Sequence, residues 1–319
     1  MVETIGLDVG GTKIAGGVVD HLGVVKASAR RKTPAGDPDA LAATIFDVAR
    51  ELQEAATQPL AGIGVACAGM VDPSGSTVVF APNLAWRNEP LRERIEAALE
   101  LPVVIENDAN AAAWGEYRFG AGAGVRDMLL VTVGTGIGGG CVSNGRLLRG
   151  AFGAAGEIGH LAMVPGGHRC GCGNRGCWET YASGSALVRE ARELVAAGSS
   201  RAAALRQLCG GKLEKLTGKH VTAAAIAGDE AARELLSDLG TAVGVGAASV
   251  AAVLDPGLVV IGGGVAEVGD LFLEPVRIAF GRHLFGRGHR NAPAVVAATL
   301  GNSAGMIGAA AIAQEKFAG

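Results

Sequence analysis

The strongest constraint on the fold is a strand, glycine turn and strand pattern that occurs twice in the chain. The first copy has apolar runs at 5–9 and 14–19 on either side of a Gly-Gly-Thr-Lys turn. The second has runs at 128–133 and 137–142 on either side of Gly-Thr-Gly. Such interrupted runs are typical of β-hairpins. Two halves that each open with one indicate a duplicated fold; the alternative is that any two β-hairpins look alike.

Strand-like and helix-like segments alternate through the rest of the chain, which predicts α/β layers. Apolar spacing and capping signals predict helices at 39–56, around 91–99, at 185–197 and at 229–254. Short apolar runs predict buried strands at 63–68, 103–105 and 258–261. The uncharged stretch 291–314 contains Pro293 and is interpreted as a strand, a loop and a buried helix rather than a membrane span.

Length and composition set outer limits. The 319 residues suffice for two domains, and a hydrophobic content of 49% allows a large core. With a formal net charge of −3 and no long basic run, we expect no nucleic-acid partner. Glu3 and Asp8 lie where a signal peptide would need a basic and then an apolar region, so a cytoplasmic protein without a membrane partner is expected.

Three glycine runs that follow strands predict a nucleotide site. The first offers two glycines, a hydroxyl, an amine and a preceding carboxylate: Gly10, Gly11, Thr12, Lys13 and Asp8. Glycines let backbone N–H groups turn toward phosphate, and the carboxylate would face the metal that accompanies a nucleotide. The runs 134–140 and 262–264 are the second and third candidates. Taken singly, each is also compatible with an ordinary turn.

The sequence Glu106-Asn107-Asp108 ends a predicted strand, and open α/β sheets bind ligands at the carboxyl ends of strands. An aspartate there can accept the proton of a hydroxyl whose oxygen attacks phosphorus. Asn107 offers both a donor and an acceptor to a sugar hydroxyl. The structural alternative is an Asx turn or a helix cap.

A cluster of cysteines predicts a metal site. Three cysteines and one histidine make a complete Cys₃His set for structural zinc: Cys170, Cys172, Cys177 and His160. His168 is a rival fourth ligand, and the spacing does not decide between the two histidines. Gly171 and Gly176 are expected to let the chain wrap tightly. The scattered Cys67, Cys141 and Cys209 are expected to be reduced thiols.

Two acids, Glu157 and Glu179, flank this cluster and are candidates to accept hydrogen bonds from a polyol, although solvated loop acids are the alternative. A zinc-bound histidine can present its second ring nitrogen to another partner. His160 could therefore connect the zinc to the sugar.

Together, five motifs resemble the ROK family (repressors, open reading frames, kinases), and within it the bacterial glucokinases. They are D-x-G-G-T-K at 8–13, E-N-D-A-N at 106–110, V-G-T-G-I-G-G-G at 133–140, G-E-I-G-H at 156–160 and C-x-C-G-x-x-G-C-x-E at 170–179. The resemblance implies an α/β, actin-like, hexokinase-type (ribonuclease H-like) duplicated fold, with two lobes and a central cleft. We expect a small domain of residues 1–109 plus 304–319, and a large domain of residues 110–303 that carries the zinc loop.

The resemblance also implies ATP-dependent phosphorylation of glucose at the 6-hydroxyl, with Mg²⁺ and a structural Zn²⁺. Asp108 would be the general base. The sugar would be bound by Asn107, Asp108, Glu157, His160 and Glu179. ATP would be bound by Asp8, Gly10, Gly11, Thr12, Lys13, Gly134 and Thr135, with Gly263 near the adenosine. Zinc would be held by His160, Cys170, Cys172 and Cys177, which decides against His168. A homodimer or homotetramer is expected.

Other functions remain open on the sequence. The substrate could be fructose, mannose, allose or N-acetylmannosamine, because the sequence does not show which hydroxyl pattern the acids satisfy. Polyphosphate could replace ATP as donor. The family also contains repressors, but only seven residues precede Asp8, so no helix-turn-helix module is expected. A non-catalytic sugar sensor would be expected to lack the base or the phosphate turn.

Overall fold

The computed structural model describes residues 2–318 and separates them into two compact units. The first runs up to Leu130, resumes over Gly140–Gly156 and takes up again at Ala298; the second comprises Val131–Gly139 and Glu157–Ala297. The predicted domain limits assigned residues 110–130, 140–156 and 298–303 to the large domain, whereas the structure places them in the first unit. The first of these segments lies there because helix α3 (Asp108–Phe119) packs along helix α10 (Ala304–Phe317).

A five-stranded sheet forms the centre of the first unit, with the strand order β3-β2-β1-β4-β8. The β1–β2 and β2–β3 pairs are antiparallel, whereas β1–β4 and β4–β8 are parallel. The strands are β1 (Glu3–Val9), β2 (Lys13–Val19), β3 (Val25–Lys32), β4 (Leu60–Cys67) and β8 (Val103–Asn107). A smaller sheet contains β5 (Met70–Val71), β6 (Val78–Phe80) and β7 (Arg87–Glu89). The predicted hairpin and the predicted strands near 63–68 and 103–105 are confirmed.

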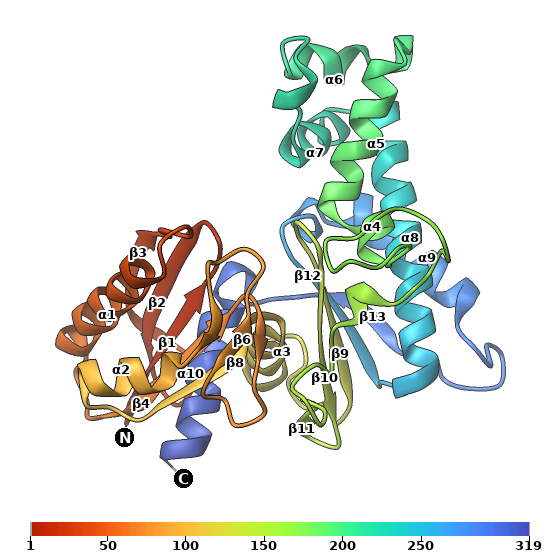
Figure 1. The fold of residues 1–319 in the computed structure, drawn as a ribbon. Helices are drawn as coiled ribbons and strands as arrows, with labels where there is room; N and C mark the ends of the chain where they lie inside the picture. The colour runs from red at the N-terminus through yellow and green to blue at the C-terminus, as the bar shows by residue number, and fades with distance from the viewer. Residues whose placement is uncertain (1, 319) are drawn as a thin grey trace. The chain divides into compact units, whose positions relative to one another are not determined.

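Helices cover both faces of this sheet (Figure 1). The apolar side chains of α1 (Pro38–Ala55) and α2 (Leu91–Leu99) join those of the sheet in one core. Asp37 caps α1 as predicted, since its carboxylate accepts the N–H groups of Asp39 and Ala40 at 3.0 Å. On the other face α10 approaches so closely that a Cβ at Gly64 would lie 1.9 Å from the carbonyl oxygen of Ala309.

The second five-stranded sheet has the order β11-β10-β9-β12-β13. Its strands are β9 (Met128–Val133), β10 (Ile137–Ser143), β11 (Arg146–Leu147), β12 (Leu258–Gly262) and β13 (Ala294–Ala297). In both sheets the third, second, first, fourth and fifth strands follow one another across the sheet. The two sheets therefore share one topology, which confirms the predicted duplication and favours it over a chance likeness of two hairpins.

The second unit carries the remaining helices, with α8 packed along α9 and a group of α5, α6 and α7 near one end of α8 (Figure 1). They are α4 (Glu179–Ala182), α5 (Gly184–Ala196), α6 (Ala203–Leu208), α7 (Gly218–Ile226), α8 (Glu230–Leu254) and α9 (Asp270–His283). Within the described residues, α8 is the one helix long and apolar enough to cross a membrane by length and composition. However, 56% of its most apolar window is buried, as in a core helix.

Trp178 fastens the cysteine-rich segment to α8. Its indole is 1% exposed and donates a hydrogen bond to the carbonyl oxygen of Ala242 at 2.9 Å. The ring lies over Gly246, where a Cβ would come within 2.0 Å of the indole. The absence of a side chain at Gly246 therefore makes room for the tryptophan.

We expect Gly246→Ala to lower the free energy of unfolding by about 1–3 kcal/mol, because the added methyl overlaps a buried ring that has no room to move. The matched control is Gly281→Ala in α9, where an added Cβ meets nothing within 4 Å. That change should stabilise the protein by about 0.5–1 kcal/mol through helix propensity. Denaturant unfolding of both variants checks this, and equal stability would contradict the packing explanation.

Candidate active site and metal centre

Three strand ends meet at one edge of the first sheet. The register pairs Val9 of β1 with Cys67 of β4, and Cys67 with Asn107 of β8. The carboxylates of Asp8 and Asp108 both act on the Cys67 thiol, whose pKa is raised by burial first and by these two negative charges second. The sequence elements predicted for phosphate and for sugar in this unit are therefore neighbours, as expected at the carboxyl ends of parallel strands.

Asn107 and Asp108 form the turn from β8 into α3. The Asn107 side-chain oxygen accepts the N–H of Asn110 at 3.0 Å and so caps the helix, while its amide group donates to the carbonyl oxygen of Gly69 at 3.1 Å. The side-chain oxygen of Asn107 therefore acts as a helix cap, which was the structural alternative. The second N–H of its amide group is left for another contact. Asp108 is half-buried at the first helical position, and one carboxylate oxygen accepts the N–H of Ala109 at 2.9 Å.

Two hydrogen bonds hold the first glycine turn, and Asn83 packs against Gly11, where an added Cβ would lie 3.1 Å from the Asn83 Cβ. Gly10 donates its N–H to the carbonyl oxygen of Lys13 at 3.0 Å, and the Thr33 hydroxyl donates to the Gly10 carbonyl at 2.7 Å. Within the described residues, the N–H groups of Gly11 and Thr12 have no acceptor. A Cβ at Gly10 would meet no protein atom closer than 3.5 Å, so the glycine is not required by packing.

Asp8 lies just before this turn at the end of β1. Burial raises the pKa of its carboxyl group, and the nearby Lys13 ammonium opposes that rise. A Cβ at Gly305, near the start of α10, would lie 3.5 Å from the Asp8 carboxyl carbon. A cation bound at this carboxylate would relieve the cost of burying its charge.

The second glycine turn is held by the start of α5. The Gly134 N–H donates to the carbonyl oxygen of Gly136 at 3.0 Å, and the Gly134 carbonyl accepts the N–H of Gly184 at 2.8 Å. The carbonyl oxygen of Thr135 accepts the N–H of Ser185 at 3.3 Å. A Cβ at Gly134 would meet nothing within 4 Å, so this turn also leaves open space above the backbone.

Gly263 of the third run has a different explanation. Its φ is +87°, and a Cβ would lie 2.4 Å from the carbonyl oxygen of Val133. The fold itself therefore requires glycine here. The next residue, Gly264, is unconstrained by packing, since a Cβ added there would meet no atom within 4 Å.

The predicted metal ligands converge. One ligand atom from each of His160, Cys170, Cys172 and Cys177 lies within 4.8 Å of all the others. Cys170 Sγ lies 3.6 Å from His160 Nδ1, and Cys172 Sγ lies 3.7 Å from Cys177 Sγ. A tetrahedral zinc with Zn–S bonds of about 2.3 Å would separate its ligands by roughly 3.6–3.8 Å. The donor set and these separations fit zinc.

Three glycines in the loop around the cluster have positive φ: Gly166 (+76°), Gly173 (+97°) and Gly176 (+78°). A Cβ at Gly176 would lie 1.7 Å from the carbonyl oxygen of Val164, so Gly176 is needed, as expected. The same expectation for Gly171 is wrong: its φ is not positive and nothing lies within 4 Å of an added Cβ. Gly173, with its positive φ, allows the tight turn that was expected of Gly171.

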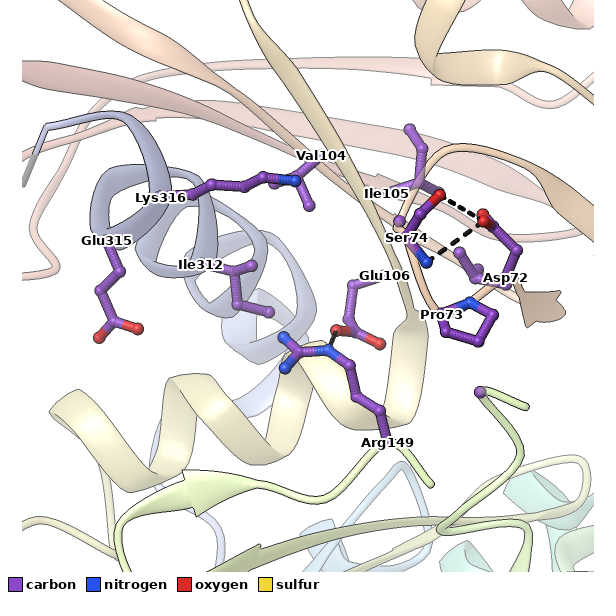
Figure 2. Close-up of a pocket in the computed structure, with 13 residues that line it drawn as sticks. Asp72, Pro73, Ser74, Val104, Ile105, Glu106, Arg149, Ile312, Glu315 and Lys316 are labelled. Atoms are coloured by element: carbon purple, nitrogen blue, oxygen red, sulfur yellow. Dashed lines mark hydrogen bonds and ion pairs between the residues drawn. The ribbon is translucent and has the colours of Figure 1, made fainter. Parts of the chain in front are cut away.

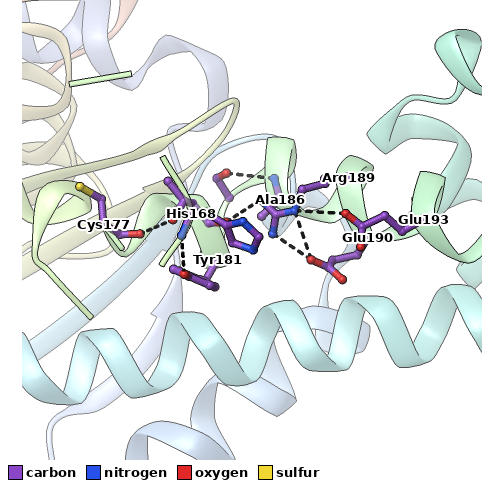
Figure 3. A network of polar contacts seen from close by, with 9 residues as sticks. His168, Cys177, Tyr181, Ala186, Arg189, Glu190 and Glu193 are labelled. Carbon is purple, nitrogen blue, oxygen red and sulfur yellow. Dashed lines mark hydrogen bonds and ion pairs between the residues drawn. The ribbon is translucent and has the colours of Figure 1, made fainter. Parts of the chain in front are cut away.

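The rival ligand His168 lies outside the cluster. Its ring packs against that of Tyr181, with centroids 5.1 Å apart, and its backbone N–H donates to the Tyr181 hydroxyl at 2.9 Å. Figure 3 shows the network that continues from this pair into α5. Arg189 donates to the Thr180 carbonyl at 2.8 Å, and the Thr180 hydroxyl donates to the Cys177 carbonyl at 2.7 Å. The backbone of Cys177, one of the predicted metal ligands, is thus tied to α5.

Both flanking acids lie beside His160, on opposite ring nitrogens. Glu157 Oε2 is 3.8 Å from Nε2, and Glu179 Oε1 is 3.6 Å from Nδ1. Glu179 also accepts a hydrogen bond from the Cys170 thiol at 3.0 Å, and a Cβ at Gly136 would lie 2.5 Å from its other oxygen. The nitrogen that faces Cys170 is therefore Nδ1, and Nε2 points toward Glu157 on the side away from the sulfur atoms.

One charged pair near the candidate base was missed from the sequence. The Glu106 side chain is 7% exposed and accepts a hydrogen bond from Arg149 Nε at 2.6 Å. The pair lines a pocket of about 340 Å³ within the first unit (Figure 2). Because the partners are 43 residues apart, no local sequence pattern predicts the contact. The one available signal that Glu106 needs a partner was its position at the end of an apolar strand.

Comparison with known proteins agrees with these features. The sequence model of the ROK family matches residues 4–316. A glucokinase of Streptomyces coelicolor is 46% identical over 98% of each chain. The crystal structure of a ROK family glucokinase from Streptomyces griseus, in complex with glucose and AMPPNP, is 45% identical, with a TM-score of 0.90 over 98% of this chain and 99% of that one. A ROK hexokinase from Thermus thermophilus is 36% identical, with a TM-score of 0.82 over 99% of each chain. The chain has the predicted actin-like, two-lobed sugar kinase fold and belongs to the ROK family.

Proposed function

We propose that this protein is a glucokinase that transfers the γ-phosphoryl group of Mg-ATP to the 6-hydroxyl of glucose. The likeness to the Streptomyces griseus glucokinase determined with glucose and AMPPNP carries the proposal, because it extends over 98% of the chain at 45% identity. The grouping of Asp8 and Asp108 at one sheet edge supports it independently, since phosphoryl transfer needs a metal-facing carboxylate and a base.

Asp108 is the proposed general base. As glucose O6 attacks phosphorus, the carboxylate takes the hydroxyl proton, and phosphorus–oxygen bond cleavage releases ADP. The hydrogen bond from the Ala109 N–H occupies Oδ1 and fixes the side chain at the helix start.

The proposed sugar-binding residues are Asn107, Asp108, Glu157, His160 and Glu179. Each offers an acceptor or donor suited to a hydroxyl group. The second amide N–H of Asn107 remains available after capping, and His160 Nε2 remains available if Nδ1 binds the metal. Hydroxyl recognition by charged and imidazole groups is selective, because a hexose with a misplaced hydroxyl would cover one of these groups without pairing it.

The proposed nucleotide-binding residues are Asp8, Gly10, Gly11, Thr12, Lys13, Gly134, Thr135 and Gly263. The N–H groups of Gly11 and Thr12, which lack protein acceptors among the described residues, would donate to phosphate oxygens. Lys13 would add charge. Mg²⁺, when bound with ATP, neutralises the phosphate charge, and Asp8 would hold it through water. Gly263 would lie near the adenosine, although its φ has a structural reason of its own.

His160, Cys170, Cys172 and Cys177 are the proposed ligands of a structural Zn²⁺. The set leaves no open coordination position for a reacting group, so the ion would shape the loop and orient His160 rather than take part in the chemistry. We further propose a cytoplasmic protein that acts as a homodimer or homotetramer, without nucleic-acid or membrane partners.

A sugar and donor panel tests the function. Coupled assays of ADP release with ATP should give the highest kcat/KM for glucose among glucose, fructose, mannose, allose and N-acetylmannosamine, by roughly 10-fold or more. Phosphorylated product with polyphosphate is followed separately by radiolabelled phosphate. A higher kcat/KM for another hexose would overturn the substrate assignment, and efficient use of polyphosphate without ATP would overturn the donor assignment.

A further inference from the structure

We infer that Glu106 and Arg149 are positioning residues that hold the Asn107–Asp108 turn in its reactive geometry. The inference rests on the proposed role of Asp108 as the base. Neither residue belongs to the proposed glucose or ATP contacts; they would act through the backbone and side chains on either side of Asp108.

The Glu106 carboxylate fixes the chain before and after Asp108. Oε1 accepts the backbone N–H of Asn107 at 3.1 Å and the side-chain amide of Asn110 at 3.2 Å. Asn110 is itself 2% exposed, and its backbone N–H donates to the Asn107 side chain. A closed set of contacts among Glu106, Asn107 and Asn110 therefore surrounds the one residue between them that would do the chemistry.

Arg149 holds Glu106 in that position. The guanidinium Nε donates to Oε2 at 2.6 Å, which leaves Oε1 to the two asparagines. Glu106 is 7% exposed and Arg149 is 41% exposed, so the carboxylate is the buried partner and depends on the arginine to compensate its charge. Without that cation the buried carboxylate would be unpaired and would turn toward the solvent of the adjoining pocket.

The segment that presents Arg149 is itself fixed in the first unit. It follows β11, and further along it a Cβ at Gly153 would lie 2.2 Å from the carbonyl oxygen of Val71. Figure 2 shows the Arg149 side chain reaching across the pocket to Glu106 at the end of β8. Two parts of the unit that are far apart in sequence thus meet beside the Asn107–Asp108 turn.

We expect Arg149→Met to lower kcat roughly 10- to 100-fold and to raise KM for glucose by a smaller factor, because a fraction of an ångström of displacement misaligns the base, while the sugar contacts proposed for the second unit stay in place. Arg149→Lys should recover part of the rate, since it restores a cation without the Nε geometry. Amide hydrogen exchange of residues 107–110 should be faster in Arg149→Met than in the wild type.

Two further variants make the test decisive. Glu106→Gln keeps an acceptor for Asn107 but presents an N–H to the Arg149 guanidinium, so it should show the same kcat loss. It serves as the test if Arg149→Met fails to fold. Arg94→Met is the matched control: Arg94 pairs with Glu89 at 2.7 Å, with 32% and 13% of the side chains exposed, in the same unit. It should lower stability without lowering kcat or changing exchange at 107–110.

If Arg149→Met and Glu106→Gln lose stability like Arg94→Met while kcat and exchange at 107–110 stay at wild-type values, the pair is merely structural and the inference is overturned. A wild-type protein that does not phosphorylate glucose would instead refute the proposed function. The exchange measurement would then still decide whether the pair fixes the turn.

Discussion

An Asp108→Asn variant should bind glucose with near-normal affinity and turn over roughly 10²- to 10⁴-fold more slowly. Asparagine has almost the same shape and can still accept the N–H of Ala109, as Asp108 does at 2.9 Å. What it lacks is the ability to take a proton. The expected loss therefore falls on kcat, and KM for glucose should change little.

The measurement is steady-state kinetics together with glucose binding by calorimetry on the same preparation. Asp270→Asn is the matched control, because Asp270 is also the first residue of its helix, α9, and has no proposed role in catalysis. Both variants lose a negative charge at a helix N-terminus, which costs about 0.3–1 kcal/mol of stability. A near-normal kcat for Asp108→Asn would show that another group is the base.

The fold could be predicted well where strands are buried and helices are amphipathic. The two glycine-turn hairpins, the helix capped by Asp37 and the strand that ends at Asn107 all appear near their predicted limits. The apolar stretch at the C-terminal end divides into β13, a loop and α10, as predicted. In each case hydrophobic periodicity and capping chemistry agree with the tertiary environment, so local signals suffice.

The elements that were missed carry weaker local signals. Strand β3 is an edge strand with the sequence VKASARRK, and its charged outer face hides the alternation. Strands β5, β6 and β7 have two or three residues each. Helix α9 contains Pro275, which reads as a helix breaker although it lies in the first half of the helix.

The candidate site divides in the same way. The Cys₃His set was predictable, because each ligand carries its chemistry in its residue type and three of them lie within eight positions. Which glycines shape the loop was not, because Gly171 and Gly173 differ only in the φ angle that the folded loop imposes. The Glu106–Arg149 pair forms only when the chain folds, and the spacing of the two residues in the sequence does not predict it.

Removal of zinc should weaken glucose binding as well as the fold of the second unit. Elemental analysis should find about one zinc per chain, as a single Cys₃His set implies. Cys172→Ser should lose the metal. Cys172 is exposed, so the substitution removes few packing contacts. The observed effects therefore reflect the loss of the metal. If the site behaves like a zinc finger, its loss removes an apparent ~10–16 kcal/mol of binding free energy that stabilises the loop.

The proposed link between the zinc and the sugar is His160. Its Nδ1 lies 3.6 Å from Cys170 Sγ, whereas its Nε2 lies 3.8 Å from Glu157. Zinc on Nδ1 would therefore fix both the tautomer and the ring orientation that present Nε2–H to a hydroxyl. A hydrogen bond to a charged or metal-polarised group contributes about 1.5–3 kcal/mol, so KM for glucose should rise by roughly 10-fold or more when zinc is lost.

Cys209→Ser is the control for a thiol-to-hydroxyl change outside the cluster. Cys209 is buried, and its thiol faces the carbonyl oxygen of Arg206 at 3.4 Å, a contact that serine can make. That variant should keep its zinc and its KM. Glucose titrations of Cys172→Ser, of Cys209→Ser and of chelated wild-type protein, each with far-ultraviolet circular dichroism as a folding check, separate the two effects. A zinc-free protein that stays folded with unchanged KM would show that the metal site and the sugar site are independent. The proposed role of His160 in both sites would then be refuted.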